Sequence, residues 1–245
     1  MKPVMLITGA SAGIGAACAR LAAPDYNLLL AYRSDRSGMA EVADVCRAAG
    51  AEVEVAQGDV SDPTDIANIY DALDQRFGQL DALVNNAGVV DMTARVTDFT
   101  HDRLRRMFDI NVIGAMLVAK EAVLRMQALA KGGVIVNVSS AAARLGSGNQ
   151  YVDYAASKAA IDCFTKGLSD EVSGENIRVM AVRPGLIETE LHAKGGEPGR
   201  ADRLAHMVPM KRKGSAEEVA QGILWLCSDS ASYVTGSTLD VTGGR

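Results

Sequence analysis

Tyr154 and Lys158 lie four residues apart in the stretch Tyr-Ala-Ala-Ser-Lys. On an α-helix, side chains at positions i and i+4 share one face, one turn apart. An ammonium group beside a phenol favours the phenolate, so we expect Lys158 to lower the pKa of Tyr154 from its usual value near ~10. Such a tyrosine can act as a general acid or base. A half-buried tyrosine beside a solvated lysine has the same spacing, so the rest of the sequence must decide.

A glycine-rich segment near the N-terminus has the context of a nucleotide site. The apolar run 4–8 predicts a buried strand, and a small-residue helix pattern begins near Gly13. Backbone N–H groups and the dipole of such a helix attract phosphate. Gly9 suits the tight turn, Gly13 the approach of a pyrophosphate, and Gly15 close packing of helix on strand. The spacing G-x-x-x-G-x-G departs from the G-x-G-x-x-G fingerprint, but the strand and helix around it favour a nucleotide site over a plain turn.

Composition restricts the class of protein. A chain of 245 residues with 48% hydrophobic and 22% charged residues fits one soluble domain, 1–245. A net charge of −5 without a basic block argues against nucleic acid as a partner. No apolar run approaches the ~20 residues of a membrane span. The first strand starts at Val4, so we expect no signal peptide and a cytoplasmic location.

Neither cysteines nor histidines cluster in the sequence. The four cysteines are scattered, which is typical of small core residues in a reducing compartment. The three histidines are isolated, so we expect no metal site. These residues are Cys18, Cys46, Cys163, Cys227, His101, His192 and His206.

Strand-like and helix-like segments alternate along the chain. Strands are expected at 4–8, 27–32, 52–56, 82–84, 133–139, 178–182 and 238–241. Helices are expected to begin near Gly13, Ser37, Pro63, His101, Tyr151 and Ser215. This alternation predicts an α/β fold: a doubly wound, Rossmann-like parallel sheet of about seven strands with helices on both faces. The irregular segment 186–214 follows a strand end, which favours a substrate lid over an ordinary surface loop.

The ordered set of motifs resembles the single-domain branch of the short-chain dehydrogenase/reductase family, from residue 8 to the C-terminal end. The set comprises Thr8-Gly9-x-x-x-Gly13-x-Gly15, Asp59-Val60, Asn85-Asn86-Ala87-Gly88, Asn111, Ser140, Tyr154-x-x-x-Lys158, Pro184-Gly185, Tyr233-Val234-Thr235-Gly236 and Asp240-Val241-x-Gly243-Gly244. Each motif is weak by itself, and their order along almost the whole chain carries the resemblance.

The resemblance implies an NAD(P)(H)-dependent oxidoreductase that transfers a hydride between nicotinamide and a carbonyl or secondary alcohol. Tyr154 would exchange the proton, and Lys158 would lower its pKa and hold the nicotinamide ribose. Ser140 would hydrogen-bond the substrate oxygen, and Asn111 would position a water near Lys158. Within the enzyme class, sugar or polyol dehydrogenases and 3-oxoacyl reductases are both similar.

Two details of the catalytic set are open to alternatives. The interval from Ser140 to Tyr154 is one residue longer than in many members, so Ser139 is an alternative to Ser140. Tyr151 competes with Tyr154, but Ala155 stands four residues after it, so the lysine spacing selects Tyr154.

The resemblance also implies a cofactor-binding set. It comprises Gly9, Ser11, Gly13, Ile14, Gly15, Arg33, Ser34, Asp59, Val60, Asn86, Ala87, Gly88, Tyr154, Lys158, Pro184, Gly185, Ile187 and Thr189. The second strand ends without the acidic residue that selects NAD. Arg33 follows it instead, and a guanidinium suits a 2′-phosphate. NADP(H) is therefore favoured, although Ala12 and Asp35 keep NAD(H) possible.

Other readings of the sequence remain. A non-catalytic NADP(H)-binding sensor would usually lack the tyrosine or the lysine, and both are present. A serine hydrolase using Ser139 or Ser140 is a further alternative, but the sequence has no G-x-S-x-G elbow.

The helical stretches 107–130 and 151–173 are apolar on more than one face, as Leu124 and Ala159 illustrate. A second apolar face predicts a partner subunit, hence a homodimer or homotetramer.

Overall fold

The computed structural model describes residues 2–188 and 199–245. Within them, one sheet of seven parallel strands has the order β3-β2-β1-β4-β5-β6-β7. The strands are β1 (Val4–Thr8), β2 (Asn27–Tyr32), β3 (Val53–Gln57), β4 (Ala82–Asn85), β5 (Gly133–Val138), β6 (Ile177–Pro184) and β7 (Thr238–Val241). The predicted doubly wound sheet is confirmed, and the strand ends differ from expectation by at most two residues.

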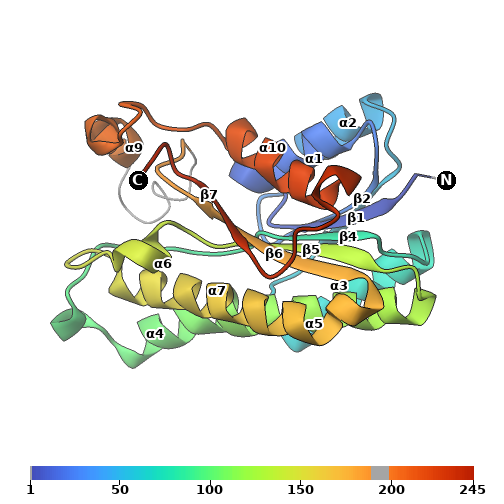
Figure 1. Ribbon diagram of the computed structural model, residues 1–245, viewed down its shortest axis with the longest axis horizontal. Coiled ribbons are helices and arrows are strands. Elements are labelled where there is room, and N and C mark those ends of the chain that lie inside the picture. The colour runs from blue at the N-terminus through green and yellow to red at the C-terminus, as the bar shows by residue number, and fades with distance from the viewer. Residues whose placement is uncertain (1, 189–198) are drawn as a thin grey trace.

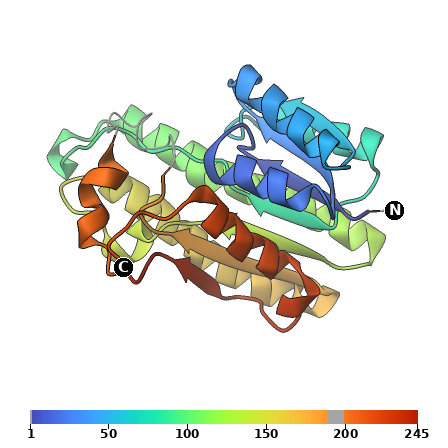
Figure 2. The same cartoon turned by 90° about the horizontal axis from the view of Figure 1, so that it is seen from above.

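Helices cover both faces of the sheet (Figure 1). On one face lie α1 (Gly13–Ala22), α2 (Arg36–Ala48) and α10 (Ala216–Cys227), and seen from above they run side by side (Figure 2). On the other face lie α3 (Pro63–Arg76), α5 (Ala115–Leu129) and α7 (Val152–Val172), with α4 (His101–Phe108) leading into α5. The short helices are α6 (Ala142–Leu145) and α9 (Arg200–Leu204), with the 3₁₀ turns η1 (Val96–Asp98), η3 (Ser173–Glu175), η4 (Ala205–Met207) and η5 (Asp229–Ala231).

Side-chain caps fix two helix starts that the sequence predicted. The Asp62 carboxylate accepts a hydrogen bond from the Thr64 N–H, with Pro63 in the first turn of α3. At α10, Ser215 and Glu218 form both bonds of a capping box. These caps satisfy backbone N–H groups in the first turns of α3 and α10.

The core consists of two layers, one on each face of the sheet. All five residues of β1 and all six of β2 are buried. Because side chains alternate along a strand, Met5 and Ile7 pack towards α1 and α10, whereas Val4 and Leu6 pack towards α3 and α5. Burial on both faces explains why these strands are continuous apolar runs.

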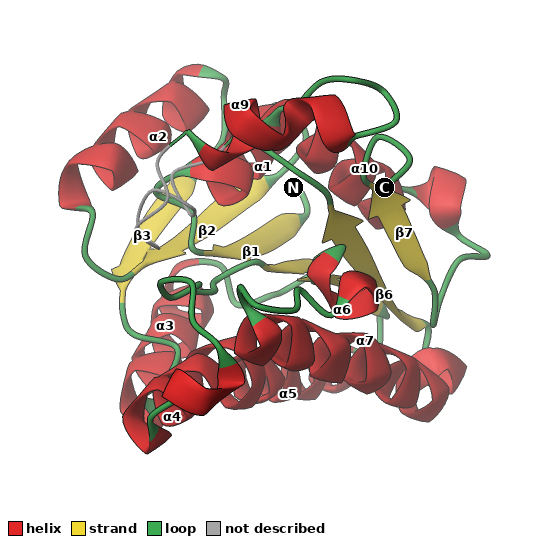
Figure 3. Cartoon of the chain, turned by 90° about the vertical axis from the view of Figure 1, so that its left-hand side faces the viewer, coloured by secondary structure: helices red, strands yellow, loops and turns green. Residues whose placement is uncertain are grey.

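The direction of winding reverses between β1 and β4. From β1 the chain proceeds outward through β2 and β3, and then returns to place β4 on the other side of β1. Ligands of such sheets bind in the crevice beyond the carboxyl ends of the strands at this reversal. Viewed along the sheet (Figure 3), α6 lies at that end.

Cysteine burial agrees with expectation at three of four positions. Cys18, Cys46 and Cys227 are buried free thiols, whereas Cys163 on α7 is exposed, so its expected core position was wrong.

Throughout residues 2–188 and 199–245, no helix is long and apolar enough to cross a membrane. No three His, Cys, Asp or Glu side chains of those residues gather into a potential metal site.

Candidate active site

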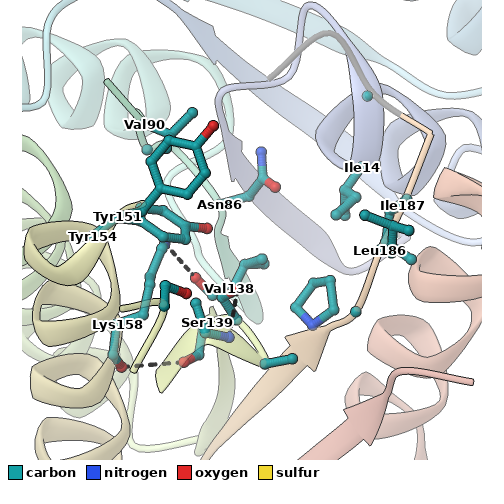
Figure 4. A pocket seen from close by; sticks show the side chains of 18 of the residues that line it. Ile14, Asn86, Val90, Val138, Ser139, Tyr151, Tyr154, Lys158, Leu186 and Ile187 are labelled. Carbon is teal, nitrogen blue, oxygen red and sulfur yellow. Dashed lines mark hydrogen bonds between the residues drawn. The ribbon is translucent and has the colours of Figure 1, made fainter. Parts of the chain in front are cut away.

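A pocket of about 510 Å³ lies at the carboxyl ends of the central strands. Its walls come from the turn after β1, the segment after β4, the end of β5, α6, α7 and the segment after β6. In Figure 4, Tyr154 and Lys158 lie on one side, and Ile14, Leu186 and Ile187 lie on the other. The volume is within the usual range for small-molecule and cofactor sites.

The glycine-rich turn forms the floor of one end of this pocket. Gly9 and Gly13 have φ angles of +66° and +54°, which favour glycine. A Cβ on Gly15 would collide with the Gly9 carbonyl oxygen and lie 2.7 Å from Asn86 Nδ2. Ala12 offers no side-chain cap to the first amides of α1, and Ser11, Gly13 and Ile14 line the pocket. These residues fit the pyrophosphate of a dinucleotide.

Asn86 ties the segment after β4 to the turn after β1. Its Nδ2 donates to the carbonyls of Thr8 at 2.9 Å and Gly9 at 3.2 Å. The Thr8 hydroxyl accepts the backbone N–H groups of Asn86 and Ala87, both at 2.9 Å. These bonds join the ends of β1 and β4 at the centre of the sheet, and they hold Ala87 and Gly88 in the pocket wall.

Tyr154 and Lys158 are both buried on the same face of α7. Lys158 Nζ donates to the Val138 carbonyl at 2.8 Å and lies 5.8 Å from the centroid of the Tyr154 ring. Burial lowers the pKa of Lys158 to about 8, against the opposing effect of the Asp162 carboxylate. A lysine with this pKa can be either protonated or neutral at a pH slightly above 7.

The expected lowering of the Tyr154 pKa by Lys158 was wrong for this arrangement. Burial has the largest effect and raises the pKa of Tyr154, while a hydrogen bond with the Ser140 side chain acts to lower it. The Lys158 ammonium donates to the Val138 carbonyl. Spacing on a helix brought the two residues to one face, but desolvation dominates the pKa of the phenol.

The two adjacent serines have different surroundings. Ser139 is 2% exposed, and its hydroxyl donates to the Lys158 carbonyl at 3.1 Å. Ser140 lies beside the Tyr154 phenol, and its Oγ accepts the Ala142 N–H at 3.1 Å. Ser139 thus joins β5 to α7, and Ser140 is the serine that shares a hydrogen bond with Tyr154.

Asn111 lies in a π-helical segment, Asp109–Gly114, between α4 and α5. The continuous helix expected over 107–130 is thus interrupted, as is frequent at functional sites. The Asn111 Oδ1 accepts the Val89 N–H at 2.8 Å, and Nδ2 donates to the Val89 carbonyl and to Ser157 Oγ. A Cβ on Gly88 would lie 3.2 Å from Asn111 Oδ1 and 3.3 Å from Lys158 Nζ. Gly88 therefore permits Asn111 and Lys158 to approach the same point.

The end of β2 carries the residues expected to select the cofactor. Arg33 and Ser34 are exposed, and Arg33 Nη1 lies 3.7 Å from Asp59 Oδ2. Burial acts to raise the Asp59 pKa, but hydrogen bonds from Ser61 and the Arg33 charge outweigh it, so the pKa is lowered. Asp35 caps α2 by accepting the Gly38 N–H at 3.0 Å.

The segment after β6 forms the far wall of the pocket. Pro184, Gly185 and Ile187 line it, and Thr189 lies outside the described residues. Backbone hydrogen bonds from Gly214 to Leu186 and from Glu188 to Gly214 join the two ends of the segment 186–214. The segment is thus closed at its base beside the pocket.

The chain matches a family model described as enoyl-(acyl carrier protein) reductase over residues 9–245. Three curated relatives are similar over nearly their full length. They are the uncharacterized oxidoreductase YgfF of Escherichia coli K12 (49% identical, 99% of each chain), glucose 1-dehydrogenase 2 of Bacillus subtilis 168 (35%, 98% and 93%) and the 3-oxoacyl-[acyl-carrier-protein] reductase FabG of E. coli K12 (34%, 98% and 96%). The chain belongs to the short-chain dehydrogenase/reductase family.

Solved structures agree with this membership. A short-chain type dehydrogenase/reductase from Mycobacterium marinum superposes with a TM-score of 0.93 at 31% identity, over 99% of this chain and 94% of the other. A 3-ketoacyl-(acyl-carrier-protein) reductase from Brucella melitensis, complexed with NADH, gives 0.90 at 30% identity over 99% and 98%. The protein is therefore an oxidoreductase of this family.

Sequence motifs missed part of the pocket of this short-chain dehydrogenase/reductase. Val90, Leu145, Gln150, Tyr151 and the C-terminal Arg245 all line it. Tyr151 was considered only as a competitor of Tyr154, whereas Val90, Leu145 and Gln150 stand in segments that carry no motif. Only the topology brings Arg245 back to the site. No pattern in the sequence signals such contacts.

Proposed function

We propose that this protein transfers a hydride between NADP(H) and a carbonyl or secondary alcohol, with Tyr154 as the general acid and base. The observation that carries the proposal is the cluster of buried Tyr154 and Lys158 with half-buried Ser140, in one pocket with the glycine-rich turn. A bound nicotinamide supplies or accepts the hydride. The chain must then deliver or remove one proton at the substrate oxygen.

Each residue of the cluster has a separate task in this proposal. Ser140 hydrogen-bonds the substrate oxygen and orients it towards the Tyr154 phenol. Tyr154 donates its proton to the developing alkoxide in reduction and accepts it in oxidation. Lys158, with a pKa of about 8, holds the ribose through its ammonium group. Asn111, held by its hydrogen bonds to Val89, positions a water near Lys158.

NADP(H) is the proposed cofactor because the exposed end of β2 carries Arg33 and Ser34. Asp35, the nearest carboxylate in sequence, is engaged in capping α2. Arg33 is 50% exposed and its contact with Asp59 is 3.7 Å long, so its guanidinium can turn to a 2′-phosphate. The remaining members of the sequence-predicted cofactor set that line the pocket would hold the rest of the dinucleotide.

The substrate is proposed to lie between α6, α7 and the pocket-lining residues Leu186 and Ile187. These two residues begin the proposed lid 186–214, of which residues 189–198 lie outside the described residues. Apolar side chains of Val90, Leu145 and Leu186 and the polar side chain of Gln150 line this part of the pocket. Both candidate classes, sugars or polyols and 3-oxoacyl thioesters, present a carbonyl or secondary alcohol. The relatives include one dehydrogenase of the first kind and one reductase of the second.

A substrate panel tests the proposal directly. Purified protein is offered ketones, 3-oxoacyl thioesters, sugars and polyols with NADPH, NADH, NADP⁺ or NAD⁺, and nicotinamide absorbance is followed. We expect turnover with at least one carbonyl or alcohol, faster with the phosphorylated cofactor. Cofactor binding without turnover of any compound, and with no difference between wild type and Tyr154→Phe, would overturn the proposal in favour of a sensor.

A further inference from the structure

Asp162 lies on α7 one helical turn beyond Lys158. Its side chain is 13% exposed, and its Oδ2 accepts a hydrogen bond from Arg183 Nε at 2.9 Å. Its Oδ1 is buried and has no hydrogen-bond partner within the described ranges. Buried carboxylate oxygens are rarely left in this state, so the position of this one calls for an explanation.

Two lysines of α7 flank Asp162, one turn to either side, and they differ in availability. Lys166 is 60% exposed and pairs with Asp170, away from the pocket. Lys158 is 5% exposed and its ammonium donates to a backbone carbonyl. Among the residues that the structure describes, no carboxylate forms an ion pair with Lys158, so the protonation of its amine depends on more distant groups.

On the sheet side, Arg183 of β6 faces Asp162. Arg183 and Asp240 are register partners on β6 and β7, and Arg183 Nη1 lies 3.6 Å from Asp240 Oδ1. Arg144 of α6 approaches the other Asp240 oxygen at 3.3 Å. Arg183 thus contacts two carboxylates, those of Asp162 and Asp240, and does not pair with Asp162 alone.

We propose that Asp162, held in place by Arg183, is a positioning residue that keeps the buried Lys158 amine protonated at working pH. The inference rests on the proposed function, which gives the Lys158 ammonium its task. In accord with this geometry, Asp162 raises the pKa of Lys158 against the larger, lowering effect of burial. Nothing in the sequence motifs assigns a role to Asp162 or Arg183.

The proposal predicts that substitutions at Asp162 and at Arg183 shift the Lys158 pKa in opposite directions. Asp162→Asn removes a negative charge one turn from the amine, so the Lys158 pKa should fall by about one unit. Arg183→Met removes the competing cation, so the Lys158 pKa should rise. Asp162→Glu retains the charge and should leave the pKa close to that of the wild type. If Asp162 and Arg183 only stabilised the fold, the two substitutions would not shift the Lys158 pKa in opposite directions.

The titration of Lys158 can be read without any turnover. The chain is labelled with ε-¹³C lysine, the Lys158 signal is assigned by its loss in Lys158→Arg, and its chemical shift is followed from pH 6 to 11. Asp170→Asn is the matched control, because this carboxylate is on the same helix but pairs with exposed Lys166. It should leave the Lys158 titration unchanged.

Failure of this inference and failure of the proposed function are distinguishable. If no substrate is ever turned over, the ¹³C titration still shows whether Asp162 controls Lys158. If turnover is found, Asp162→Asn should move its alkaline limb to lower pH by the same amount as the titration. An unchanged or raised Lys158 pKa in Asp162→Asn overturns the inference. Should circular dichroism show that variant unfolded, an unchanged or lowered pKa in Arg183→Met overturns it.

Discussion

At the scale of the residue, the phenol of Tyr154 is the group on which the proposed chemistry depends. Tyr154→Phe keeps the ring and removes the proton donor, so turnover should fall by at least ~10²-fold, the scale of general acid–base catalysis. Cofactor affinity, measured by calorimetry, should stay near that of the wild type. Lys158→Ala is the informative contrast, because it should lose turnover and cofactor affinity together. Wild-type turnover in the Phe variant would refute the assignment.

Arg33 determines the choice between cofactors in our proposal. Arg33→Ala removes a charged donor from the 2′-phosphate, so NADPH affinity should fall by ~1.5–3 kcal/mol, as for hydrogen bonds to charged groups. NADH affinity should change little. Titrating both cofactors against wild type and variant measures the difference. Equal losses for both cofactors would mean that Arg33 serves only to hold Asp59, which it approaches at 3.7 Å.

At the scale of the element, the close approach of α1 to the turn after β1 depends on Gly15. A Cβ there would collide with the Gly9 carbonyl and crowd Asn86. Gly15→Ala should therefore lower the free energy of unfolding by ~1–3 kcal/mol, the usual cost of overpacking, and weaken dinucleotide binding. Urea unfolding and calorimetry measure the two effects.

Gly167→Ala on α7 is the matched control for this change. It lies in a helix with no atom within 4 Å of the added Cβ. The free energy of unfolding should rise by ~0.5–1 kcal/mol, because alanine favours helix. If both alanine variants behaved alike, close packing at Gly15 would not be the reason for its glycine.

At the scale of the whole molecule, the outer faces of α5 and α7 remain apolar in places. Ile113, in the π-helical segment that leads into α5, is 49% exposed, and Leu124 of α5 is 48% exposed. Ala159 and Cys163 are exposed on α7. We propose that a second copy of the chain covers this surface. Light scattering should then give a multiple of the 25.7 kDa chain mass at working concentration, whereas a mass near one chain would refute the oligomer.

A charge on this surface should dissociate the oligomer. Ala159→Asp is the suitable variant, because Ala159 is exposed, whereas Phe164 is half-buried against the core and a charge there would disturb the fold itself. Activity should fall on dissociation, since Tyr154 and Lys158 are on the same helix. Glu41→Lys, at an exposed ion pair on α2 on the other face of the sheet, is a control for charge change, and its mass should stay that of the oligomer.

The amino-acid sequence alone determined the order of strands and helices, the glycine-rich turn and the Tyr154–Lys158 pair. Each of these is local: a buried parallel strand needs a continuous apolar run, a helix places i and i+4 on one face, and a tight turn needs glycine. The ordered motifs also sufficed to predict the family. The spacing of residues does not show how deeply a side chain is buried. For this reason we expected the Tyr154 pKa to be lowered, whereas burial raises it.

Only the tertiary structure decided which serine meets Tyr154, how Asn111 is held, and which charges surround Lys158. Ser139 and Ser140 are neighbours in sequence, yet β5 directs one hydroxyl to the Lys158 carbonyl and leaves the other beside Tyr154. Asp162 and Arg183 are 21 residues apart and meet because α7 packs on β6. Such contacts arise from the packing of separate elements, and no local pattern in the chain encodes them.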